Sequence, residues 1–199
     1  APEWHRNAKM IASVWLLASE AYPEYPMSNH MQYYGPYHDG VAWPLYPRKQ
    51  YIGLAPNWLA TRKTSGDVIG ECLMDFSIQD AEAQAFRLSE KWKVAAEKMF
   101  ALRGQYTENY LRSREINLME ALNLMFRTAY NIFRFYRIRE DNPDFTQEMK
   151  MIMYEEILAS ERLAELCEAD SRIGFHSEAE TYKFTPEKLR LRASILKQF

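Results

Sequence analysis

Residues 77–102 read SIQDAEAQAFRLSEKWKVAAEKMFAL, and this stretch decides the fold class. Its apolar positions recur at alternating steps of three and four residues, which is the period of one face of an α-helix. Ser77 is a suitable cap, and Asp80 stands at the third helical position of a capping-box variant. We therefore predict a long amphipathic helix that ends at Gly104. Its apolar face carries Ile78, Ala81, Ala85, Leu88, Trp92, Ala95, Met99 and Leu102.

The same period continues downstream and predicts three more helices. The second begins near Thr107 and carries two adjacent apolar rows, which indicate that it packs on more than one side. The third begins at Pro143 with Asn142 as its cap, and the fourth begins at Pro186 with Thr185 as its cap. Long helices joined by short turns favour antiparallel neighbours. The fold class is therefore mainly α, an up-and-down helical bundle.

Residues 22–76 have a different character. An amphipathic stretch at residues 4–18 ends before them, and prolines then occur at a density that excludes a helix. Tyrosines and tryptophans lie between the prolines, so this segment must pack on the bundle or meet a ligand, and we expect both. We interpret residues 1–199 as a single helical domain of a larger protein. It comprises the irregular aromatic-rich segment 22–76 and the bundle 77–199.

Composition excludes several classes of protein. Twenty-five basic and 27 acidic residues leave a net charge of -2, which argues against a nucleic-acid partner, because binding a polyanion needs a cationic surface. No apolar run approaches the about 20 residues of a membrane-spanning helix. The chain starts with Ala1 rather than Met, so we expect a processed chain or an excised piece. Cys72 and Cys167 belong to no CxxC motif, so we expect buried free thiols, with a disulfide left open.

The first candidate site is a dense polar and aromatic cluster at residues 29–43. Flat aromatic rings stack on the apolar faces of sugar rings, while Asn, Gln, His and Asp fix the orientation by hydrogen bonds. The simpler alternative is that these rings cover the bundle. No Ser or Cys nucleophile accompanies the histidines, and no HxxxH or ExxH spacing supports a metal, so we expect no triad, metal or cofactor. The substrate-binding candidates here are His30, Tyr34, Tyr37, His38, Asp39 and Trp43.

The second candidate site lies at residues 172–184, between the third and fourth predicted helices. His176, Glu178 and Glu180 are its substrate-binding candidates. The two-residue spacing places both carboxylates on one side of an extended segment. Glycoside hydrolysis needs such a pair about 5 to 10 Å apart. The alternative is that the glutamates hold Arg172 or cap a neighbouring helix.

Both candidate sites resemble parts of a known family. The run YYGPYH at residues 33–38, followed by Trp43-Pro44 and a long helical tail, is similar to the C-terminal helical region of α-glucuronidase-like glycoside hydrolases and related uncharacterised bacterial proteins. Residues 174–184, GFHSEAETYKF, are similar to a closing segment of that group. In such enzymes the catalytic carboxylates sit on a preceding (β/α)8 barrel. The resemblance implies a secreted or periplasmic accessory part, without catalytic carboxylates of its own, that lines a sugar site completed by another domain.

Three functions remain open at this point. The favoured one is a helical accessory domain of a carbohydrate-active enzyme, which contributes its aromatic loop to a glycan-binding site. The second is a non-catalytic helical interaction module that packs against another domain or subunit, with a large exposed apolar patch. The third is a metal-dependent enzyme that uses His30, His38 and His176.

Overall fold

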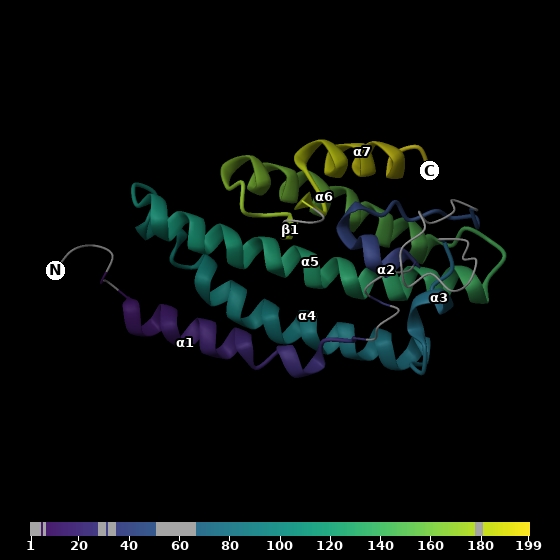
Figure 1. Ribbon diagram of the computed structural model, residues 1–199, viewed down its shortest axis with the longest axis horizontal. Helices are drawn as coiled ribbons and strands as arrows, with labels where there is room; N and C mark the ends of the chain where they lie inside the picture. The colour runs from purple at the N-terminus through teal and green to yellow at the C-terminus, as the bar shows by residue number, and fades with distance from the viewer. Residues whose placement is uncertain (1–4, 6, 28–30, 32–34, 51–66, 178–180) are drawn as a thin grey trace.

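The structure is a computed structural model that describes residues 5, 7–27, 31, 35–50, 67–177 and 181–199 (Figure 1). For His38, Asp39, His176, Ser177 and Thr181 the structure describes the backbone only. Among the described residues no helix is long and apolar enough to cross a membrane.

Five long helices build an up-and-down bundle and confirm the predicted mainly-α fold class. α1 (Ala8–Ser19) packs on α4 (Ile78–Phe100), and α4 packs on α5 (Tyr110–Asp141). α5 packs in turn on α6 (Gln147–Ala169), and α6 packs on α7 (Pro186–Leu196). Figure 1 shows α5 through the middle of the molecule, with α4 and α1 on one side and α6 and α7 on the other. The position of α5 explains its wide apolar face, since it is packed on both sides.

Side-chain caps set where the long helices begin. The Ser77 hydroxyl oxygen accepts a hydrogen bond from the backbone N–H of Asp80 at 3.0 Å, as predicted for the start of α4. Thr185 caps α7 in the same way, again as predicted. The predicted start of α6 at Pro143 was wrong. Thr146 caps this helix, whereas the Asn142 side chain donates backwards to the carbonyl of Ile138 in the last turn of α5.

The prediction that residues 22–76 contain no helix was also wrong. The described part of this segment holds two short α-helices, α2 (Gly35–Asp39) and α3 (Gly70–Leu73), and two 3-10 turns, η2 (Tyr22–Glu24) and η3 (Gly40–Ala42). Proline is compatible with them because Pro36 and Pro23 lie in a first turn, where a missing N–H breaks no helical hydrogen bond.

Buried side chains form three clusters along the bundle. One joins α1 and α4 to the first half of α5, and another joins α5, α6 and α7 around Leu163 and Leu189. The third lies where α4, α5 and α6 meet residues of the proline-rich segment, among them Trp43, Leu45 and Ile69. The described part of that segment is therefore part of the core.

The cysteines lie in two different clusters. Cys72 and Cys167 are both buried and neither forms a disulfide, as expected from their spacing. Burial raises the pKa of Cys72 to about 12 and that of Cys167 to about 11. Neither thiol has the thiolate character of a reactive cysteine at neutral pH.

A two-stranded antiparallel hairpin connects α6 to α7. It pairs β1 (Phe175–Ser177) with β2 (Thr181–Tyr182). Gly174 precedes β1 with φ +89°, and a Cβ atom there would lie 2.4 Å from the Phe184 carbonyl oxygen. This position therefore requires glycine both for its backbone conformation and for the close approach of the returning chain.

Asp170 fixes the end of α6 by accepting from two arginines. Arg114 Nη2 lies 2.6 Å from Asp170 Oδ1, and Arg172 Nη2 lies 2.6 Å from Asp170 Oδ2. These side-chain hydrogen bonds, first from Arg114 and then from Arg172, hold the pKa of Asp170 well below its usual range. Arg172, which the sequence allowed to pair with the nearby glutamates, thus has Asp170 as a partner.

Replacing Asp170 by asparagine is expected to make stability less dependent on pH. A carboxyl group with a lowered pKa stabilises the fold fully above its unfolded pKa, and this contribution is lost as the pH falls through the folded pKa. Asp170→Asn should therefore lower the free energy of unfolding by about 1–2 kcal/mol at pH 7, a modest value because Arg172 is mostly in solvent. Urea unfolding at several pH values from 7 to 3 measures the free energy of unfolding of the variant and the wild type. If the difference between them stays constant over this range, the lowered pKa of Asp170 is contradicted.

Candidate functional site

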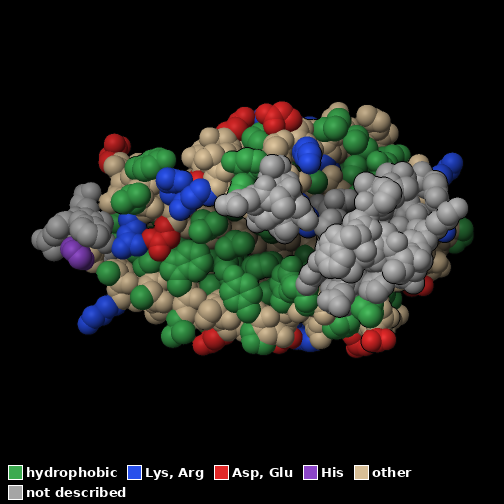
Figure 2. Space-filling view, in the orientation of Figure 1, with side chains coloured by type: hydrophobic (Ala, Val, Ile, Leu, Met, Phe, Trp, Pro, Cys, Tyr) green, Lys and Arg blue, Asp and Glu red, His purple; other side chains and the backbone are tan. Residues whose placement is uncertain are grey.

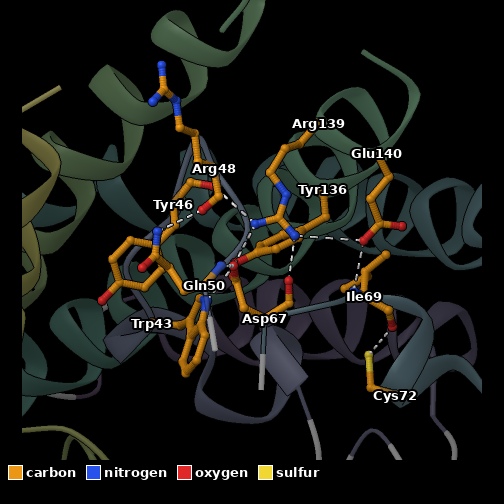
Figure 3. A network of polar contacts seen from close by, with 10 residues as sticks. All are labelled: Trp43, Tyr46, Arg48, Gln50, Asp67, Ile69, Cys72, Tyr136, Arg139 and Glu140. Carbon is orange, nitrogen blue, oxygen red and sulfur yellow. Dashed lines mark hydrogen bonds and ion pairs between the residues drawn. The ribbon is translucent and has the colours of Figure 1, made fainter. Parts of the chain in front are cut away.

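A buried polar network joins the proline-rich segment to α5 (Figure 3). Its centre is the Asp67 carboxylate, which accepts from the Tyr136 hydroxyl at Oδ1 and from Arg139 Nη1 at Oδ2, 2.8 Å away. The backbone N–H of Gln50 also donates to Oδ2, at 2.7 Å. The indole N–H of Trp43 donates to the Tyr136 hydroxyl oxygen at 2.7 Å. Three separate parts of the chain therefore meet at one carboxylate.

The helical period of α5 explains why Tyr136 and Arg139 act together. They are three residues apart on the buried face, and the Arg139 guanidinium carbon lies 4.3 Å from the centre of the Tyr136 ring. Arg139 Nη1 also donates to the carbonyl of Tyr46 at 3.2 Å, and Nη2 donates to the carbonyl of Asp67. The Arg139 guanidinium thus binds two segments of the chain, one at Tyr46 and one at Asp67.

Burial dominates the electrostatics of this network. The Asp67 side chain is fully buried and that of Arg139 is 6% exposed, so the ion pair stands in a low-dielectric surrounding. Burial, and then the neighbouring Asp67 carboxylate, raise the pKa of Tyr136 well above its usual value. Tyr136 therefore stays protonated and donates to Asp67 across the ordinary pH range.

A hollow of about 380 Å³ opens beside this network. The carboxylate of Glu140 accepts from the backbone N–H of Ile69 at 3.2 Å, and partial burial raises the pKa of Glu140 above its usual value. The hollow thus combines apolar walls with cationic donors and a carboxylate acceptor, which is the composition of a small polar-ligand site. Its lining comprises Pro47, Arg48, Lys49, Val68, Arg139, Glu140, Asn142 and Pro143.

A second buried network holds Trp43 from the other side. Arg192 of α7 donates from Nε to the carbonyl of Trp43 at 2.6 Å and from Nη1 to the hydroxyl of Ser160 at 2.7 Å. Its Nη2 lies 2.8 Å from Glu156 Oε2, and both side chains are buried. Glu156 also accepts from Asn131 at 2.7 Å. The backbone of Trp43 and its indole are therefore fixed by different helices.

The structure corrects the assignment of Trp43 as a substrate-binding ring. Trp43 is 5% exposed, and its indole is held in the core by Tyr136. Tyr37 is also packed inward, because its ring stacks on Phe133 with centroids 4.7 Å apart. Burial raises the pKa of the Tyr37 hydroxyl well above its usual value. An amphipathic ring can satisfy its polar tip inside a core, as the Trp43 indole does with the Tyr136 hydroxyl.

The other sequence-predicted site residues stay predictions. The backbones of His38 and Asp39 lie in α2 and that of His176 lies in β1, while their side chains are outside the description. Another four, His30, Tyr34, Glu178 and Glu180, lie outside the described residues altogether. Within the part of the chain that is described, no group of three or more His, Cys, Asp or Glu side chains could hold a metal ion.

The sequence did contain a signal for the network residues that were missed. Arg139 continues the apolar row of Ile132 and Tyr136, and Arg192 stands between Leu189 and Leu196 on the buried side of α7. A charged residue at a core position of an amphipathic helix indicates a buried partner.

Comparison of the chain with protein-family models, curated protein sequences and solved structures gives no match.

Proposed function

We propose that this chain is a helical accessory domain of a carbohydrate-active enzyme, and that its proline-rich segment contributes to a glycan-binding site at the hollow beside Glu140. The observation that carries the proposal is the hollow itself, which stands between two segments fixed by the Asp67 network. The resemblance to the helical region of α-glucuronidase-like enzymes adds to it. Bacterial origin and secretion rest on that resemblance alone.

Several hydrogen bonds hold the segments around the hollow together, and a preformed site favours ligand binding. Asp67 uses both carboxylate oxygens to hold Gln50, Tyr136 and Arg139 in place. A preformed site loses less conformational entropy when a ligand binds. Arg48 and Lys49 can donate to sugar hydroxyl or carboxylate oxygens, and the ring of Pro143 offers an apolar wall.

We propose no catalytic residue in this chain. The role that fits the Asp67 carboxylate is structural, because its two oxygens accept from three groups on two other chain segments. The catalytic carboxylates would belong to another domain of the enzyme, as the family resemblance implies. The hollow then binds and orients part of a glycan, while the bond is cleaved elsewhere.

Affinity electrophoresis in native gels tests the proposal. Gels would contain a polyuronate, a neutral xylan or a neutral β-glucan, and we expect at least one of them to retard the wild-type chain. The variant Arg48→Ala/Lys49→Ala should bind that glycan about tenfold more weakly, since it removes two charged donors. The matched control Lys93→Ala/Lys98→Ala removes the same charge from exposed positions of α4 and should bind as wild type does. Equal mobility of the wild-type chain with and without every glycan would refute the function.

One observation favours the second candidate, a helical interaction module. Several large apolar side chains are mostly exposed: Leu16 at 66%, Leu111 at 71%, Tyr154 at 63% and Leu191 at 61%. Such side chains on more than one helix would be covered by a neighbouring domain or subunit. Light scattering on the isolated chain distinguishes the candidates, because an interaction module should self-associate whereas a clean monomer argues against it.

A further inference from the structure

A cluster of five aromatic rings lies where α1 and η2 meet α4 and α5. Trp92 and Phe126 are its inner rings, with centroids 4.9 Å apart and both side chains buried. Trp15, Tyr22 and Tyr25 surround them edge to face, at centroid distances between 5.8 and 6.3 Å. The three outer rings reach the surface, and Tyr22 is 50% exposed. Figure 2 shows hydrophobic side chains gathered over this part of the molecule.

The outer rings are held in fixed orientations. The indole N–H of Trp15 donates to Glu115 Oε1 at 2.7 Å, and Arg112 binds the other oxygen of that carboxylate. Tyr22 is fixed by two edge-to-face contacts, one with Trp92 and one with Phe126. A ligand that stacks on these rings therefore meets a preformed surface and orders few side chains when it binds.

Ion pairs border the rings at both ends. The Arg112–Glu115 pair lies beside Trp15, and its side chains are only partly exposed. Glu24, next to Tyr25 in the sequence, is held by Arg87 and Lys91, each at 2.7 Å. Hydrogen bonds from Lys91 and then Arg87 lower the pKa of Glu24, so this border stays charged.

The combination of flat rings and charged borders decides which chemical class of ligand fits. An apolar partner laid across the rings would remove water from the ion pairs and give them no new hydrogen bonds. A sugar ring instead offers an apolar C–H face to the aromatic rings and hydroxyl groups to the carboxylates and guanidiniums around them. The observations therefore favour a ligand with both an apolar face and hydroxyl groups, as a sugar ring has, over a purely apolar partner.

We infer that Trp15, Tyr22 and Tyr25 form a second carbohydrate-binding surface, separate from the hollow at Glu140. The inference rests on the proposed carbohydrate function and extends it. Phe126 and Arg139 are 13 positions apart on α5, about 20 Å along the helix at 1.5 Å per residue. The ring surface is therefore separate from the hollow and would bind a sugar independently of it.

Substitution of Tyr22 tests the inference in the same glycan-containing gels. Tyr22→Ala should weaken binding about three- to tenfold, the range that an aromatic contact contributes, and Tyr22→Phe should retain the affinity because it keeps the ring. Tyr154→Ala is the matched control, since it removes an exposed tyrosine from α6 and should leave binding unchanged. A thermal melt of each variant confirms that it is folded.

Three other outcomes would overturn the inference. They also show whether the ring surface fails alone or together with the proposed function. If wild type binds and only Arg48→Ala/Lys49→Ala weakens the binding, the ring surface is refuted and the hollow stands. If wild type binds none of the glycans, both proposals fail. If Tyr22→Ala leaves glycan binding unchanged and alters the molar mass in light scattering, the rings form a protein interface instead.

Discussion

Replacing Arg192 by methionine is expected to lower the free energy of unfolding by about 3–5 kcal/mol, the cost of leaving one partner of a buried ion pair uncompensated. In the wild type, Arg192 Nη2 lies 2.8 Å from the buried Glu156 carboxylate. The variant leaves that carboxylate without its cation. It also removes the donors to the Trp43 carbonyl and the Ser160 hydroxyl. Urea unfolding followed by circular dichroism measures the change.

Two further variants distinguish the effect of the stranded buried charge from the effect of a general loss of packing. Arg190→Met, on the same helix, breaks only an exposed pair with Glu168 and should cost less than about 1 kcal/mol. Adding Glu156→Leu to Arg192→Met should recover part of the lost stability, because it removes the stranded charge, although the buried Asn131 and Thr128 side chains then lose this acceptor. A loss no larger for Arg192→Met than for Arg190→Met would contradict the assigned role of this pair.

Local sequence signals predicted the bundle well, because its helices are long and strongly periodic. The row from Ile78 to Met99 and the caps Ser77 and Thr185 all depend on residues within one or two turns. The start of α6 failed because Asn142-Pro143 and Thr146 both offer a plausible cap within four residues. Asn142 does not cap α6, because its side chain donates to the carbonyl of Ile138 in the preceding helix. Thr146 therefore becomes the cap.

The candidate site was harder to predict, because it forms only when distant segments meet. Asp67 and Arg139 are 72 positions apart, and Trp43 and Arg192 are 149 apart. Tryptophan has an apolar body with one polar tip, so the sequence alone allows Trp43 to face either a ligand or the core. The Tyr136 hydroxyl, which the sequence does not place, settles the outcome by accepting the indole N–H inside the core.

Replacing Arg139 by methionine is expected to cost about 3–5 kcal/mol and to loosen the wall of the hollow. Asp67 would stay buried and lose the Arg139 guanidinium, while the Tyr136 hydroxyl and the Gln50 N–H remain as neutral donors. Arg139→Lys keeps the charge but lacks the planar fork that binds the Tyr46 and Asp67 carbonyls together, so we expect an intermediate loss. Arg134→Met, which breaks a more exposed pair with Glu148, should cost about 1 kcal/mol or less.

Hydrogen exchange shows whether that loss is local to the site or spread over the bundle. The Gln50 amide donates to Asp67, so in Arg139→Lys it should exchange faster, while amides in the middle of α4 keep their wild-type protection. This pattern would mean that the ion pair holds the two segments bordering the hollow, as the proposed binding site requires. Unchanged protection at Gln50, or uniform loss throughout α4 and α5, would mean that the pair stabilises the fold without shaping the hollow.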